Sequence, residues 1–143
     1  MKFLFLLSFL ILAVCNIRAE LTKEEAMAIA IGCKEEAGAS DADFEAMIKH
    51  EPAETQEDKC MRACAFKKLG VMDDEGKMIK DAAIELSKSL IKHEDKLELA
   101  IGVIETCGEL EVSDDHCEAA EEYRHCWRNE LKSKGASSAE DLI

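Results

Sequence analysis

The sequence predicts an all-α fold, a compact six-helix domain held together by disulfide bonds. Three observations predict it: 48% of the 143 residues are hydrophobic but only 5% are aromatic, proline occurs once, and apolar residues recur at helical spacing. This composition excludes a disordered acidic chain and a sandwich or barrel of many short strands. Acidic residues outnumber basic ones 31 to 18, and the resulting net charge of −13 argues against nucleic acid as a partner.

Residues 1–19 have the features of a secretory signal peptide. Lys2 precedes an apolar run over 3–14, which is too short to span a bilayer comfortably. Cleavage is expected after Ala19, with cleavage after Cys15 as the alternative, and no second hydrophobic stretch is long enough to anchor the chain. The sequence therefore predicts a secreted protein whose domain covers residues 20–143.

Either cleavage removes Cys15 and leaves an even number of cysteines. In the oxidising environment of a secreted protein, six cysteines predict three disulfides. A metal site would need paired cysteines or histidines at close spacing, and none occurs, so neither a metal nor a cofactor is expected. The six cysteines are Cys33, Cys60, Cys64, Cys107, Cys117 and Cys126.

Capping signals delimit the first two predicted helices. Thr22 with Glu25 forms a capping-box pattern that starts a helix, and Gly38 ends it. Ser40 starts the second helix, which Pro52 separates from the third.

Four more helices follow by the same reasoning. Thr55 starts the third, which runs to about Leu69. Apolar residues at helical spacing predict a fourth helix over 79–90 and a fifth over 97–104, and the fifth is expected to be the most buried. Ser113 is the expected N-cap of the sixth.

Helix geometry limits how the cysteines can pair. Cys60 and Cys64 are one turn apart on one helix, and Cys117 and Cys126 are about 13 Å apart along another. Neither pair can form an unstrained bridge, which leaves about ten of the 15 pairings open. The third and sixth helices must each be bonded to two other elements.

The spacing of the six cysteines is specific: Cys33-x26-Cys60-x3-Cys64-x42-Cys107-x9-Cys117-x8-Cys126. In this spacing the sequence resembles a known family, the insect odorant-binding proteins of the pheromone/general odorant-binding group. Three local segments, 59–64, 67–73 and 115–117, agree with it, and the resemblance extends to about Lys132. In detail the chain is most similar to a fly subgroup related to the pheromone-binding-protein-related proteins.

The resemblance implies a six-helix fold around an internal apolar cavity that carries small volatile or lipid-like molecules through aqueous lymph. It also implies the bonds Cys33–Cys64, Cys60–Cys117 and Cys107–Cys126, a pairing among those that helix geometry allows. Because three crosslinks reduce the entropy of the unfolded chain, the domain would tolerate a hollow centre.

Apolar residues on the predicted helices are candidate walls of the cavity, and ordinary helix packing is the alternative interpretation. Met61, Ala65 and Leu69 form a ridge that is expected to be mainly core, although Leu69 is also a candidate wall residue. The flexible thioether of methionine suits a site that adapts to several ligands. The other candidates are Met47, Ile48, Phe66, Met72, Met78, Ile79, Ala83, Leu86, Ile101, Ile104 and Trp127.

The function that these observations favour is a secreted carrier, not an enzyme, because no catalytic motif is present. Its expected ligands are uncharged amphiphiles of about ten to twenty carbons, such as odorants, pheromones or lipid-like molecules. The alternative is a carrier or protein-binding factor in gustatory, haemolymph or reproductive fluid. A membrane receptor is a further candidate partner, and a monomer or weak homodimer in sensillum lymph is expected.

Residues 133–143 form a predicted flexible tail with an apolar tip, Leu142 and Ile143. The tip is a hypothetical lid over the cavity. Near neutral pH, the carboxylates of Glu140, Asp141 and the chain end are expected to keep it from burying deeply, and acid is expected to change its position.

Overall fold

The computed structural model describes residues 21–136 and Leu142, and this part of the chain is all-α as predicted. None of its helices has the length and apolar character needed to cross a membrane. The expected signal peptide and its cleavage site lie outside the described residues. The six helices are α2 (Lys23–Ala37), α3 (Asp41–Ile48), α4 (Gln56–Lys68), α5 (Lys80–Leu90), α6 (Glu94–Gly108) and α7 (His116–Ser133).

Local side-chain chemistry starts the first helices where the sequence predicts. At α2 the Thr22 hydroxyl accepts a 3.1 Å hydrogen bond from the Glu25 N–H, and the Glu25 carboxylate accepts one of 2.8 Å from the Thr22 N–H. Ser40 and Asp43 form the same reciprocal capping box at α3. Gly38 ends α2 with φ of 66°, a left-handed conformation that glycine adopts without strain.

The predicted N-cap of the last helix is wrong by two residues. Asp115, not Ser113, is the N-cap of α7, because its carboxylate accepts hydrogen bonds from the N–H groups of both Cys117 and Glu118. The Ser113 hydroxyl instead accepts a 3.1 Å bond from the Asp115 N–H. A carboxylate at the positive end of the helix dipole stabilises the helix start better than a neutral hydroxyl does.

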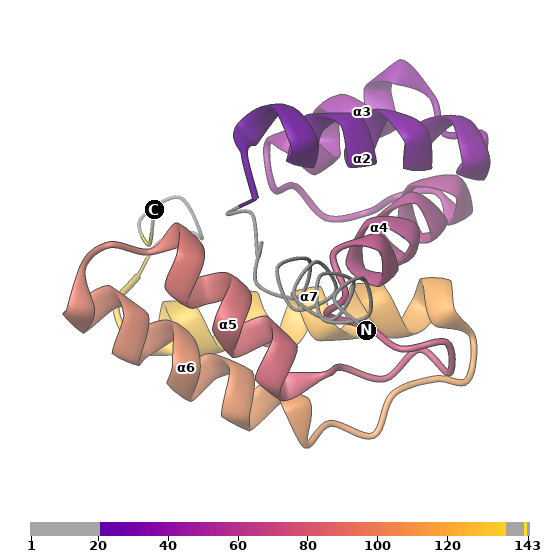
Figure 1. Ribbon diagram of the computed structural model, residues 1–143. Helices are drawn as coiled ribbons and strands as arrows, with labels where there is room; N and C mark the ends of the chain where they lie inside the picture. The colour runs from indigo at the N-terminus through magenta and orange to yellow at the C-terminus, as the bar shows by residue number, and fades with distance from the viewer. Residues whose placement is uncertain (1–20, 137–141, 143) are drawn as a thin grey trace, which may run out of the picture.

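The helices pack in two groups that meet at α4 and α7. Figure 1 shows α2 and α3 on one side of the molecule and α5 and α6 on the other. α4 contacts α2, α3 and α7, while α6 contacts α5 and α7. α4 and α7 therefore form the centre of the fold.

Three disulfides fasten this arrangement. They join α2 to α4, α4 to α7 and α6 to α7, so α4 and α7 are each bonded to two other helices, as helix geometry requires. Each crosslink typically stabilises a fold by about 2–4 kcal/mol. The bonds are Cys33–Cys64, Cys60–Cys117 and Cys107–Cys126, the pairs that the resemblance implies.

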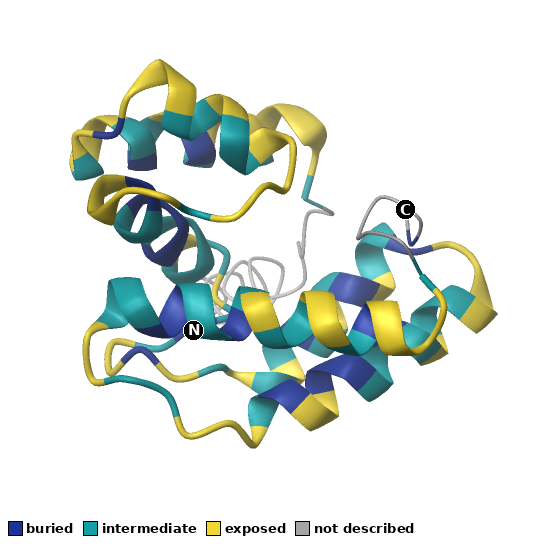
Figure 2. Ribbon diagram, turned by 180° about the vertical axis from the view of Figure 1, so that it is seen from behind, coloured by how far each residue is buried: buried dark blue, intermediate teal, exposed yellow. Residues whose placement is uncertain are grey.

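Within the described residues, most buried apolar side chains belong to three small clusters instead of one large core. Figure 2 shows them along the faces where the helices meet. One cluster lies between α2 and α4, a second contains Ala120 and Tyr123 of α7, and a third contains Val103 of α6 and Leu131 of α7. The expectation that the fifth helix is the most buried is wrong, because α4, α6 and α7 each have four buried residues.

The structure also corrects the expectation for the chain end. Leu142 is only 3% exposed and packs in the cluster that contains Ile91, Val103 and Leu131. Burying its side chain gains about 1.5–3 kcal/mol. The carboxylates of Glu140, Asp141 and the chain end, and the side chain of Ile143, lie outside the described residues.

Candidate functional site

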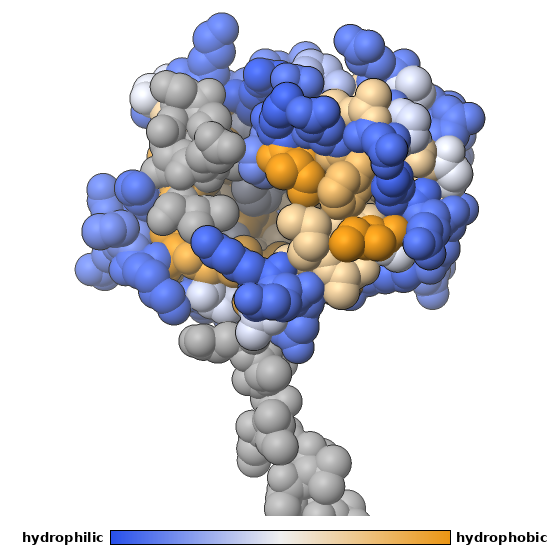
Figure 3. Space-filling view, turned by 90° about the horizontal axis from the view of Figure 1, so that it is seen from above, coloured by the Kyte–Doolittle hydropathy of each residue, from blue (hydrophilic) through white to orange (hydrophobic). Residues whose placement is uncertain are grey.

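A hollow of about 600 Å³ lies among five of the six helices. Its lining is mainly apolar, and Figure 3 shows one face of the molecule on which apolar side chains gather beside a depression, framed by hydrophilic ones. The volume is in the range of small-molecule binding sites. The residues that line this hollow are Ala26, Ile29, Ala30, Met47, Ile48, Lys49, His50, Arg62, Ala65, Phe66, Leu69, Val71, Met72, Met78, Ala83, Leu86, Ser87, Tyr123, Arg124, Trp127, Arg128 and Leu131.

Helix periodicity places the apolar lining. On α7, Tyr123, Trp127 and Leu131 follow one another at steps of four, so they form a single stripe along the hollow. On α2, Ala26, Ile29 and Ala30 have the corresponding spacing. Each stripe belongs to a helix whose other faces meet solvent or a neighbouring helix.

The connection between α4 and α5 supplies two methionines. Met72 and Met78 face each other as an isolated antiparallel pair. The turn between them is fixed by Asp73, whose carboxylate accepts hydrogen bonds from the N–H groups of Glu75 and Lys77 at 3.0 and 2.8 Å. Gly76, with φ of 79°, completes the turn. The short turn brings both methionine side chains to the hollow.

The neutral polar groups of the hollow already have partners. The Tyr123 hydroxyl accepts a 3.1 Å hydrogen bond from the Met78 N–H, and the Ser87 hydroxyl donates one of 2.9 Å to the Ala83 carbonyl. In the described ranges, every buried side-chain nitrogen and oxygen has a hydrogen-bond partner. The hollow can therefore take up apolar groups without leaving these side-chain atoms unsatisfied.

All charged lining residues are basic, and three of them have carboxylate partners. Arg62 makes a bidentate ion pair with Asp58 at 2.7 and 3.1 Å, with both side chains buried. Arg124 makes a bidentate pair with Glu121 at 2.8 and 2.6 Å. Lys49 pairs with Glu45 at 2.6 Å, and the hydrogen bond to that carboxylate raises the pKa of Lys49.

The structure places nine of the twelve predicted wall residues in the hollow and leaves three outside. Ile79, which is 39% exposed, is the N-cap residue of α5, and Ile104 is fully buried elsewhere. Ile101 also lies outside, because no residue of α6 reaches the hollow. The residues inside are Met47, Ile48, Phe66, Leu69, Met72, Met78, Ala83, Leu86 and Trp127.

The ridge on α4 is shared between core and hollow. Met61 is fully buried, and Ala65 packs against the cluster of Met61 and also lines the hollow. Leu69 lines the hollow. The three α2 residues were missed, although their spacing on the first helix was a usable signal. Arg124 and Arg128 were also missed, because basic residues on a helix are normally solvated.

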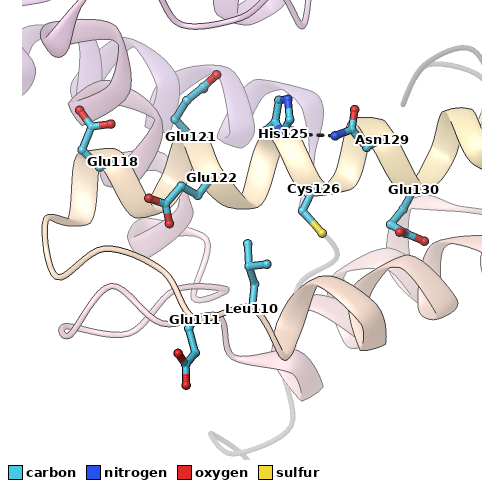
Figure 4. Close-up of a pocket in the computed structure, with 9 residues that line it drawn as sticks. All are labelled: Leu110, Glu111, Glu118, Glu121, Glu122, His125, Cys126, Asn129 and Glu130. Carbon is cyan, nitrogen blue, oxygen red and sulfur yellow. Dashed lines mark hydrogen bonds between the residues drawn. The ribbon is translucent and has the colours of Figure 1, made fainter.

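A second depression, of about 570 Å³, has a different character. It is rich in carboxylates, of which Glu118 pairs with Lys59 at 2.9 Å and Glu122 accepts a 3.0 Å hydrogen bond from the Ser113 N–H. Among the residues that the structure describes, no group of three or more potential ligands could hold a metal ion. Figure 4 shows its lining residues: Leu110, Glu111, Glu118, Glu121, Glu122, His125, Cys126, Asn129 and Glu130.

Comparison with known proteins identifies the family. The model of the PBP/GOBP family matches residues 18–130. The chain belongs to the PBP/GOBP family. Members similar to it include general odorant-binding protein 28a of Drosophila melanogaster, 40% identical over 134 residues that cover 91% of this chain and 94% of that protein. General odorant-binding protein 19d of the same fly is 40% identical over 117 residues, 81% of this chain and 78% of that protein.

Solved structures of other proteins have the same fold. Odorant-binding protein 28a of Drosophila melanogaster is 39% identical, with a TM-score of 0.70 over 82% of this chain and 93% of its own. A pheromone-binding protein of the cockroach Leucophaea maderae, in complex with the fluorescent reporter 1-anilinonaphthalene-8-sulfonic acid, has a TM-score of 0.61 at 20% identity, over 80% of this chain and 98% of its own. A fatty-acid-binding protein from the oral disk of the blowfly Phormia regina is equally similar, with a TM-score of 0.61 at 20% identity over 81% of this chain and 99% of its own.

Proposed function

We propose that the protein is a secreted carrier that binds small hydrophobic molecules reversibly in the hollow. The observation that carries the proposal is the lining itself, which is mainly apolar and in which the neutral polar groups, Ser87 and Tyr123, already have partners. The hollow therefore serves binding.

The size of the hollow suits ligands of about ten to twenty carbons. Apolar area removed from water contributes about 25 cal/mol per Å². After association costs, a ligand of this size retains about −8 kcal/mol, which corresponds to micromolar affinity. Reversible binding of this strength suits a carrier, because it allows release.

The relatives support a role in chemical sensing but leave the fluid open. Two fly relatives are named odorant-binding proteins, which favours sensillum lymph and delivery to a membrane receptor. A structural neighbour comes from a blowfly oral disk, which favours a gustatory fluid instead. We propose the olfactory role first and the non-olfactory role second, with the protein acting as a monomer or weak homodimer.

Uptake of the neutral fluorescent probe N-phenyl-1-naphthylamine by the oxidised mature protein tests the proposal. We expect micromolar binding of the probe and its displacement by 1-dodecanol. In the variant Ala83→Trp the new side chain fills part of the hollow, so probe affinity should fall at least about tenfold. The control Ala42→Trp, at an exposed site on α3, should bind as the wild type does.

Two outcomes would contradict the carrier role. One is the absence of probe uptake by protein with all three disulfides formed. The other is equal binding by Ala83→Trp and Ala42→Trp, which would place the probe outside the hollow.

A further inference from the structure

Among the lysine and arginines of the hollow, Arg128 alone has no side-chain partner within the described residues. Arg128 of α7 lines the hollow and is exposed, which places its side chain at the mouth. In the part of the chain that the structure describes, its guanidinium makes no hydrogen bond or ion pair. By contrast, Arg62 and Arg124 are each held by a bidentate carboxylate.

The neighbours of Arg128 add positive charge. Arg124 lies one turn earlier on α7, and like charges at this spacing repel each other. Both oxygens of Glu121 are engaged by Arg124, so this carboxylate is not a ready partner for Arg128.

The hollow is basic in a chain that is otherwise strongly acidic. Five of its 22 lining residues are basic or histidine and none is acidic, although the chain has 31 acidic and 18 basic residues. The acidic side chains of α7 lie instead in the second depression (Figure 4). α7 thus has Arg128 at the mouth of the hollow and its carboxylates on another face.

We propose that Arg128 binds the carboxylate of a single-chain amphiphile whose alkyl chain occupies the hollow. This inference rests on the proposed carrier function and adds the class of ligand, a long-chain carboxylate instead of an uncharged molecule. A guanidinium presents a planar pair of donors that matches the two oxygens of a carboxylate. An anion at this position also offsets the repulsion between Arg124 and Arg128.

The apolar lining fits the remainder of such a ligand. Trp127 lies next to Arg128 in the sequence, and both residues line the hollow. Leu86 on α5 and Phe66 on α4 add apolar surface to the same lining. A chain with one anionic end therefore finds apolar side chains and a guanidinium in one hollow.

Competition against N-phenyl-1-naphthylamine at pH 7.4 tests the proposal with two ligands of equal chain length, dodecanoate and 1-dodecanol. The wild type should bind dodecanoate about tenfold more tightly, since hydrogen bonds to charged groups are stronger than neutral ones. In Arg128→Gln this preference should disappear through loss of dodecanoate affinity alone. Lys132→Gln removes the same charge one turn further along α7, outside the hollow, and should keep the preference.

Three results would overturn the proposal. The first is wild-type protein that binds 1-dodecanol as tightly as dodecanoate. The second is an equal loss of affinity for both ligands in Arg128→Gln, which would mean that Arg128 contributes only packing. The third is a loss of dodecanoate affinity in Lys132→Gln equal to that in Arg128→Gln, which would indicate only a general attraction of the anion to positive charge. Binding of 1-dodecanol in each case keeps the carrier function intact, whereas failure of the probe and of both ligands to bind would refute both proposals.

Discussion

The hydroxyl oxygen of Tyr123 accepts a 3.1 Å hydrogen bond from the backbone N–H of Met78. The two residues are far apart in the sequence, and both line the hollow. Tyr123 is only 4% exposed, so water does not readily replace this bond. It ties the connection before α5 to the centre of α7.

Replacing Tyr123 with Phe should therefore cost about 1–2 kcal/mol of unfolding free energy, because the Met78 N–H is left without an acceptor. Chemical denaturation of the oxidised protein measures the change. Phe66→Tyr, which adds a hydroxyl elsewhere in the hollow, is a useful comparison. A variant Tyr123→Phe as stable as the wild type would show that the bond contributes nothing.

Two features require glycine at position 76: its positive φ and the His116 side chain that a Cβ would meet. Its φ of 79° costs a residue with a side chain about 1–2 kcal/mol, and an added Cβ would lie 2.8 Å from the His116 ring. Gly76→Ala should therefore be destabilised by at least about 1 kcal/mol. Gly102→Ala is the matched control, because Gly102 is inside α6 with no atom near the added Cβ, and it should gain about 0.5–1 kcal/mol. Denaturation curves that shift in the same direction for both variants would contradict this.

Asp43 should make stability depend on pH in the acidic range. Its pKa is lowered from 3.8 chiefly by the Ser40 hydroxyl, then by the Ser40 N–H and the Thr55 hydroxyl. Because the pKa is lower in the folded state, the stabilisation is present above the unfolded pKa and is lost as the pH falls through the folded one. The difference in thermal midpoint between wild type and Asp43→Asn should be constant above about pH 5 and shrink below about pH 4.

The control for this titration is Asp114→Asn, at an exposed residue without a hydrogen bond or ion pair in the described ranges. Its difference from the wild type should vary less between pH 5 and pH 2. Parallel curves for the wild type and Asp43→Asn down to pH 2 would exclude Asp43 as a source of acid sensitivity.

Leu142 should contribute to stability without affecting ligand affinity. It packs beside Leu131 in a buried cluster but does not line the hollow. Leu142→Ala should lower the unfolding free energy by about 2 kcal/mol, with probe affinity changed less than about twofold. Leu110→Ala, at a residue that is 40% exposed, should cost less than about 0.5 kcal/mol. A large loss of affinity in Leu142→Ala would instead support a lid.

Local chemistry explains which parts of the fold were predictable. The capping boxes at Thr22 and Ser40 depend on residues three apart, so the sequence alone identifies them. Membership of the hollow is different, because Leu86 and Ile104 are both apolar residues at helical spacing. Only the packing of α6 against α5 and α7 keeps Ile104 outside.

The two arginines of α7 that line the hollow could not be predicted for the same reason. Arg124 and Arg128 are one turn apart, a spacing that solvated helices also show. The ion pair of Arg124 with Glu121 is local to α7, because the two residues are three apart. The hollow beside α7 is also lined by residues of other helices, so its position arises from tertiary structure and is not present in a single segment.

The five methionines of the described chain allow the most direct test of ligand binding in the hollow. Met47, Met72 and Met78 line it, whereas Met61 is fully buried in the core and Met27, 42% exposed, lies on the surface of α2. Spectra of the mature protein with ¹³C-labelled methionine methyl groups should be recorded during titration with 1-dodecanol. We predict that the signals of Met47, Met72 and Met78 shift and saturate together, while those of Met27 and Met61 stay almost unchanged. Saturable shifts confined to Met27, or no shifts at a ligand concentration that displaces the probe, would contradict binding in the hollow.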